Sequence, residues 1–302
     1  MLIEWKDNLI SSPKDGAIYL LQKLNDDAGF FTVDGKLLYV VKNSAHEPPR
    51  SVKTEYLEFR TSISIQALEI LPQFESGTYN LIQYSGDITD TNFESFVRLC
   101  TLHSKHIESI GFYKFFNSLI DIFQLPKEQR NKNLIGLYGE LKFIKETYQQ
   151  YGVDLSQFWH GKSMDRYDFS CPHVNFEVKT TMSNPPVIHL KHDQIFNDAN
   201  NYLIVISLVD DNSGETLGEL IQYFKEEKPF TENYNFQMSI EHEHHRVSKE
   251  FETRKFTVRF LRSFNVSKLE TLQGIPDRIS DITYHYDISG LEGEDYSLVL
   301  PQ

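Results

Sequence analysis

Two side chains of opposite charge, Glu177 and Lys179, stand two positions apart in an apolar run at residues 174–181. Alternate residues of a strand face the same way, so a strand here points both charges to one face and the apolar residues to the core. A carboxylate can bind a hard divalent cation through oxygen. A lysine two positions on, roughly 7 Å along the strand, can reach a water or phosphate beside that cation. The spacing therefore favours a metal site that handles water and phosphate.

Two further carboxylates can converge on this point. Asp168 lies nine residues before Glu177, and a hairpin that turns through Pro172 and His173 brings the two together. Glu140, on the flank of the preceding apolar-striped helix, is a third carboxylate. Carboxylates that converge are costly unless a cation holds them. We therefore expect a magnesium site with open positions for water and a phosphate.

The Glu-x-Lys spacing alone is weak, because chance supplies about three acid-x-Lys triplets in a chain of this composition. Five are present, and only the one at Glu177 lies in a buried-type strand just after an Asp-bearing strand. Two plainer interpretations stay open. Glu177 and Lys179 can form a cross-strand surface pair, and Glu140 can be a solvated acid on a helix flank.

The elements that must position these residues follow from the apolar periodicity. From residue 127 onward the pattern predicts a helix at 127–150, strands at 166–170, 174–181 and 187–190, a short helix at 191–200, a buried strand at 202–209 and a helix at 215–227. Strands and helices are interleaved in this order. Residues 127–228 therefore predict a mixed α/β core.

The flanking regions carry no catalytic spacing. Residues 1–95 predict a β-rich N-terminal domain for recognition or assembly, with strands at 16–24, 36–42, 61–65 and 77–84 and a turn at Asp34-Gly35. Residues 96–126 have helical spacing up to a break at 125–127 and predict a helical connector. Residues 229–302 predict a β-rich C-terminal extension, with strands at 249–264 and 281–289. The His-Glu-His-His tract at 242–245 lacks the spacing of a zinc helix and predicts a solvated loop or strand.

Composition narrows the function classes. Acids outnumber bases by 43 to 30, so the net charge of −13 excludes a protein that holds nucleic acid by bulk positive charge alone. A hydrophobic content of 40% excludes a disordered chain. The two cysteines form no framework, the N-terminus has no apolar signal region, and the longest apolar stretch, 202–209, is too short for a membrane span. We expect a cytoplasmic protein with no membrane partner.

At these residues the chain resembles the PD-(D/E)XK nuclease superfamily, and its whole layout resembles an uncharacterised bacterial family of PD-(D/E)XK motif proteins. The motifs that carry the resemblance are Gly-x-x-Gly-Glu at 136–140, Asp-Phe at 168–169, Glu-Val-Lys-Thr-Thr at 177–181 and a His…Gln segment at 189–194. The superfamily's Pro-Asp pair is Tyr167-Asp168 here. The resemblance implies a restriction-endonuclease-like core: a mixed central sheet flanked by helices, in an α+β or α/β class.

The resemblance also implies roles for individual residues. Asp168 and Glu177 would bind Mg²⁺, for which Mn²⁺ can substitute, together with the Val178 carbonyl. Lys179 would orient or help deprotonate the attacking water. The two remaining motif residues would assist, Glu140 by holding a second metal or its waters and Gln194 by contacting the phosphate or orienting the nucleophile.

The function that this implies is a metal-dependent DNA endonuclease of a bacterial restriction or phage-defence system, with DNA, neighbouring defence proteins and a second copy of the chain as partners. The alternative is a nuclease-fold subunit that mainly binds partner proteins or DNA and cleaves little by itself. The β-rich N-terminal region and the acidic charge motivate that alternative.

Overall fold

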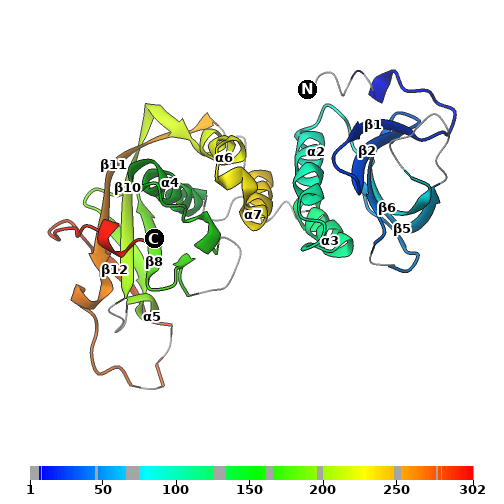
Figure 1. The fold of residues 1–302 in the computed structure, drawn as a ribbon. Coiled ribbons are helices and arrows are strands. Elements are labelled where there is room, and N and C mark those ends of the chain that lie inside the picture. Colours follow the sequence, from blue (N-terminus) through cyan, green and yellow to red (C-terminus); the bar gives the residue numbers. More distant parts are fainter. Residues whose placement is uncertain are drawn as a thin grey trace. The chain divides into compact units, whose positions relative to one another are not determined.

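The computed structural model describes residues 7, 9–44, 47–65, 75–124, 134–160, 166–195, 200–247, 253–276, 278–279 and 281–301. Tertiary contacts divide the chain into two compact units, Met1–Leu125 and Pro126–Gln302, and each unit has a sheet of its own (Figure 1). The expected break at 125–127 lies outside the described residues.

The first unit is built on a six-stranded antiparallel sheet. Its strands are β1 (Tyr19–Lys23), β2 (Ala28–Val33), β3 (Lys36–Lys42), β4 (Ser51–Lys53), β5 (Leu57–Ile65) and β6 (Gly77–Tyr84), in the spatial order β1-β2-β3-β6-β5-β4. The predicted turn between β2 and β3 is confirmed: Asp34 and Gly35 have φ of 49° and 79°, as a two-residue hairpin turn of type I′ requires. Each predicted strand overlaps an observed one, whereas the sequence pattern does not predict β2 or β4.

Two helices complete this unit. Helix α2 (Thr91–Ser104) begins after Asp90, whose carboxylate accepts a hydrogen bond from a backbone N–H two residues on, and α3 (Phe112–Phe123) follows. The helices pack through aromatic rings, since Phe116 of α3 stacks on Phe59 of β5 at 4.3 Å between ring centroids. The helices expected as a connector thus belong to the body of the first unit.

The second unit contains a four-stranded mixed sheet in the order β11-β10-β8-β7. Its elements are α4 (Leu134–Tyr151), η2 (Ser156–Phe158), β7 (Phe169–Ser170), β8 (Asn175–Thr181), β9 (Val187–Lys191), α5 (His192–Ile195), β10 (Asn201–Thr216), α6 (Leu217–Glu226), η3 (Phe230–Glu232), α7 (Tyr234–Arg246), β11 (Lys255–Asn265), η4 (Val266–Lys268), β12 (Thr283–Asp287) and η5 (Ser297–Val299). Strand β8 is parallel to β10, while β7 and β11 run antiparallel to their neighbours. The predicted order of elements from α4 to α6 is confirmed.

Both faces of this sheet are covered. Ile204 and Ile206 of β10 pack with the apolar residues of α4, α6 and α7. Leu203 and Val205, which point the other way, pack with the two-stranded ribbon of β9 and β12. A strand that is buried on both faces typically has a continuous run of apolar residues, and β10 has such a run at 202–209. Figure 1 shows α4 and α6 beside the sheet.

The expected β-rich extension at 229–302 is wrong in part. Strand β11 is not appended but pairs along β10 as an edge strand of the central sheet. The tract at 242–245 lies in helix α7, whose N-terminus is capped by the Asn233 side chain, accepting from Phe236 N at 3.1 Å. The apolar stripe of α7 is short and lies between charged residues, which hides its helical period in the sequence.

No helix in the described part of the chain is both long enough and apolar enough to cross a lipid bilayer.

Candidate active site

Strand β8 carries the central motif in a largely buried position. Glu177 is 3% exposed, and the Lys179 side chain is 24% exposed. The parallel register places Glu177 beside Leu203 and Lys179 beside Val205, so both project to the face that β9 and β12 cover. Lys179 Nζ donates a hydrogen bond to Glu177 Oε1. The burial of Glu177 does not fit the interpretation of a surface pair.

Asp168 reaches the edge of β8 at the point where the short strand β7 begins. Phe169 of β7 pairs with Phe176, and Asp168 Oδ2 accepts a hydrogen bond from Val178 N at 2.7 Å. The N–H and C=O groups of one strand residue point to the same edge. The Val178 carbonyl therefore faces the edge at which Asp168 lies.

Glu140 approaches β8 from the opposite face, on helix α4. The preceding residue makes this approach possible, because a Cβ on Gly139 would lie 1.8 Å from Thr180 Oγ1. Thr180 and Glu177 are an odd number of positions apart and so point to opposite faces of β8. Three carboxylates thus surround one strand edge: Glu140 from one face, Glu177 from the other, and Asp168 at the edge itself.

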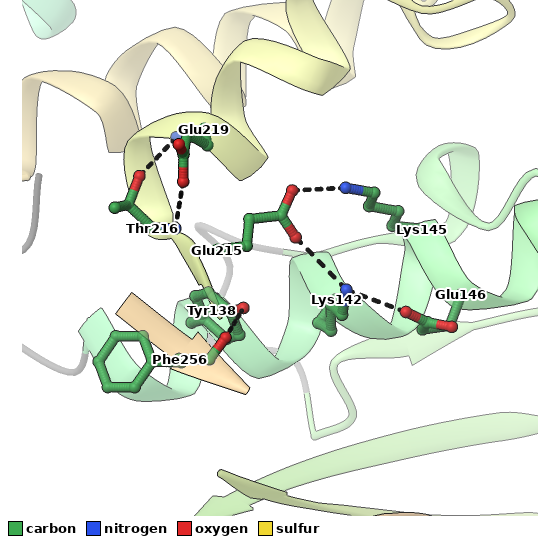
Figure 2. A network of polar contacts seen from close by, with 8 residues as sticks. All are labelled: Tyr138, Lys142, Lys145, Glu146, Glu215, Thr216, Glu219 and Phe256. Atoms are coloured by element: carbon green, nitrogen blue, oxygen red, sulfur yellow. Dashed lines mark hydrogen bonds and ion pairs between the residues drawn. The ribbon is translucent and has the colours of Figure 1, made fainter. Parts of the chain in front are cut away.

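Helix α4 is fixed in place by a polar network on its other flank (Figure 2). Glu215, at the end of β10, accepts from Lys142 Nζ at 3.3 Å and from Lys145 Nζ at 2.5 Å. Tyr138 donates through its hydroxyl to the Phe256 carbonyl of β11 at 3.3 Å. Next to Glu215, Thr216 and Glu219 form a capping box that begins α6. These contacts hold α4, and with it Glu140, against the sheet.

Burial raises the pKa of all three carboxyls, and repulsion from neighbouring carboxylates adds to it at Glu140 and Glu177. Burial, followed by the charge of Asp168, raises the pKa of Glu140 to about 8 and that of Glu177 to about 7. Burial also raises the pKa of Asp168, against the opposing effect of the hydrogen bond from Val178 N. A cluster of carboxyl groups with raised pKa values is typical of metal-binding or catalytic sites.

Two neighbours complete the arrangement. Gln194 of α5 donates through Nε2 to Glu177 Oε1 at 2.6 Å, so its amide contacts the motif directly. Trp159 donates through its indole N–H to Glu140 Oε2 at 2.8 Å, and its ring packs edge-on against Phe236. Sequence reasoning assigned no role to Trp159. The available signal was that a partly buried indole N–H usually finds an acceptor, and a carboxylate was already expected nearby.

Glu140, Asp168 and Lys179 border a cavity of about 630 Å³. Its walls also include Val178 of β8 and His189 of β9. The cavity therefore opens at the edge of β8, beside Glu140 and Asp168.

The donor set fits Mg²⁺ in kind, since carboxylate and carbonyl oxygens are the ligands that hard cations prefer. Glu177 Oε2 is buried and has no hydrogen-bond partner among the described residues, while Oε1 is shared by Lys179 and Gln194. An unpaired buried carboxylate oxygen is costly and is relieved by a cation. Within the described ranges, no three His, Cys, Asp or Glu side chains are placed to hold one ion together.

Among curated proteins and among solved structures, none matches the chain. A family model matches residues 31–289 and so covers the site and the first-unit sheet from the middle of β2 onward. This match confirms the PD-(D/E)XK resemblance, and the chain belongs to the family described as "Putative PD-(D/E)XK family member, (DUF4420)".

Proposed function

We propose that this chain is a metal-dependent endonuclease that hydrolyses phosphodiester bonds in DNA. The observation that carries the proposal is the edge of β8: Asp168 accepts from Val178 N, and the buried Glu177 contacts Lys179 there. Membership of a PD-(D/E)XK family supports a nuclease-like activity.

The roles of the residues follow from their chemistry. Asp168, Glu177 and the Val178 carbonyl would hold Mg²⁺ or Mn²⁺, and Glu140 would hold a second ion or its waters. When bound, such an ion lowers the pKa of a water and offsets negative charge on the phosphate. Lys179 borders the cavity and carries N–H donors to the water and to the charge that develops on phosphate oxygens.

Gln194 and Trp159 act on the carboxylates rather than on the phosphate. Gln194 donates to Glu177 Oε1 and so orients the carboxylate, whereas the resemblance implied a contact with the phosphate or an orienting contact with the nucleophile. Trp159 donates to Glu140 Oε2 and favours its ionised form. One contact thus orients a carboxylate and the other favours its ionised form, and both effects favour binding of a cation.

A second function is favoured by one observation. Lys179 and Gln194 both donate to the same oxygen of Glu177, an arrangement that occupies the motif with internal contacts. A nuclease-fold subunit that binds partner proteins or DNA and cleaves little by itself would keep such contacts. The place of the chain in a restriction or phage-defence system, its partner proteins and a homodimer stay predictions from the resemblance.

Incubation of the pure protein with plasmid, linear and single-stranded DNA tests the two functions. In Mg²⁺ or Mn²⁺, the wild type should cleave, and Asp168→Ala should abolish cleavage. Cleavage that survives Asp168→Ala contradicts the assigned site. DNA binding without cleavage, in every metal, supports the binding-subunit function instead.

A further inference from the structure

Two histidines, a residue type that can bind metal ions, face each other on the β9–β12 ribbon. His189 of β9 and His285 of β12 are directly opposite each other in the antiparallel register. Their ring centroids are 4.1 Å apart, with 59° between the ring planes. Both side chains are exposed. The alternating residues Ile188, Leu190, Tyr284 and Tyr286 turn inward and pack on the sheet.

The ribbon fixes the backbone on which the two histidines stand. Directly opposite residues in an antiparallel pair have Cβ atoms about 4.5–5.5 Å apart, so their side chains reach the same point above the sheet. The apolar inner face of the ribbon packs with Leu203 and Val205 of β10. The backbone positions of the pair are therefore fixed by strand register and by a buried face.

The ring geometry suits a shared ion. With a ring nitrogen about 2.0–2.1 Å from a zinc ion, each ring centre is roughly 3.2 Å from it, and tetrahedral ligation separates the ring centres by about 5 Å. The observed 4.1 Å requires an opening of only about 1 Å, which rotation of two exposed side chains supplies. The imidazole lone pairs lie in the ring planes, so a 59° tilt allows them to meet, whereas parallel stacked rings do not.

We propose that His189 and His285 form a dihistidine site for a borderline divalent transition metal ion, with Zn²⁺ as the representative ion. Neutral imidazole is a preferred ligand of zinc, nickel and copper, whereas Mg²⁺ prefers oxygen, so this site is chemically distinct from the carboxylates around β8. His189 also lines the cavity of about 630 Å³ that contains Asp168 and Lys179. The ion would lie at the rim of that cavity, with its remaining coordination positions open to water or a phosphate oxygen. The proposal stands independently of the proposed function.

The test is a titration of the ¹⁵N-labelled full chain with Zn²⁺, in excess Mg²⁺ to occupy the carboxylates. We expect one equivalent of Zn²⁺ to shift the imidazole nitrogen resonances of His189 and His285 together. His189→Ala and His285→Ala should each weaken Zn²⁺ affinity by more than about tenfold and abolish the response of the remaining ring, because loss of a ligand costs at least as much as loss of its outer-shell partner.

Matched variants separate this site from other sources of binding. His173→Ala removes an exposed imidazole elsewhere in the unit, and Lys191→Ala changes the outer face of the same strand; both should bind Zn²⁺ as the wild type does. Asp168→Asn should also retain the affinity. Wild-type affinity in either histidine variant, no response of the two rings, or loss of the response in Asp168→Asn would each overturn the proposal.

Discussion

The close approach of helix α4 to strand β8 yields a prediction whose size can be worked out. In Gly139→Ala the new Cβ would lie 1.8 Å from Thr180 Oγ1 and 3.1 Å from Thr180 Cβ, so the helix or the threonine must move. Overpacking of this kind costs about 1–3 kcal/mol, and the better helix propensity of alanine offsets up to about 1 kcal/mol. We expect Gly139→Ala to lower the free energy of unfolding by about 1–2 kcal/mol.

A double-mutant cycle isolates the cause. Thr180 Oγ1 is buried without a hydrogen-bond partner in the described part of the chain, so Thr180→Ala should change stability by less than about 1 kcal/mol. In the double variant only the contact at 3.1 Å remains, and most of the loss should be recovered. Gly218→Ala is the matched control, because its Cβ would meet nothing nearer than 3.8 Å.

The assay is urea unfolding followed by intrinsic fluorescence, to which Trp159 contributes from the second unit. Thr180→Ala should restore both the stability of Gly139→Ala and the position of the neighbouring Glu140. The reasoning fails if Gly139→Ala is as stable as the wild type, or if the double variant is no more stable than Gly139→Ala alone.

Three further predictions concern the carboxylates. Glu177 and Glu140 must ionise to bind Mg²⁺, so the thermal stabilisation of the protein by Mg²⁺ should increase from about pH 6 to about pH 9. Calorimetry in two buffers should detect the protons that are released on binding. Stabilisation that is constant across this pH range contradicts the raised pKa values. The pKa of Glu177 is raised from 4.5 to about 7, so ionisation of this carboxyl lowers the free energy of unfolding as pH rises between these values. Without metal, Glu177→Gln should therefore be about 1–3 kcal/mol more stable than the wild type at pH 8 and equal to it near pH 4. Chemical unfolding at the two pH values measures this difference. Trp159→Phe removes the donor to Glu140 and should move the pH midpoint of Mg²⁺ binding upward by about one unit, while an unchanged midpoint would mean that the indole only packs.

Local sequence pattern was sufficient for the strand that carries the motif. The alternation around Glu177 and Lys179 predicts a strand with both charges on one face, and the register with β10 has this arrangement. The return of the chain between Asp168 and Glu177 also follows from a short hairpin, since few residues separate the two strands. Both features depend on neighbours in sequence, which is why pattern reasoning reaches them.

Contacts between distant elements were not predictable in this way. Gln194 was expected to contact the phosphate or orient the nucleophile, and sequence pattern did not predict that it donates to Glu177 from α5. Helix α7 was expected as loop or strand because its charged residues read as solvated. Glu241 is fully buried there, but Lys225 of α6 pairs with it at 2.7 Å. The partner that makes such a burial tolerable lies on another element and leaves no local signal.

The central claim is that phosphodiester hydrolysis depends on the residues at the edge of β8. The most direct measurement is the initial rate of DNA cleavage in Mg²⁺ by the wild type and by Lys179→Met, with Lys36→Met of the first unit as a control for loss of an exposed lysine. We predict a loss of at least about 100-fold for Lys179→Met and none for the control, since a positioned proton donor or acceptor contributes about 10²–10⁴-fold. Cleavage by Lys179→Met at the wild-type rate would contradict the account.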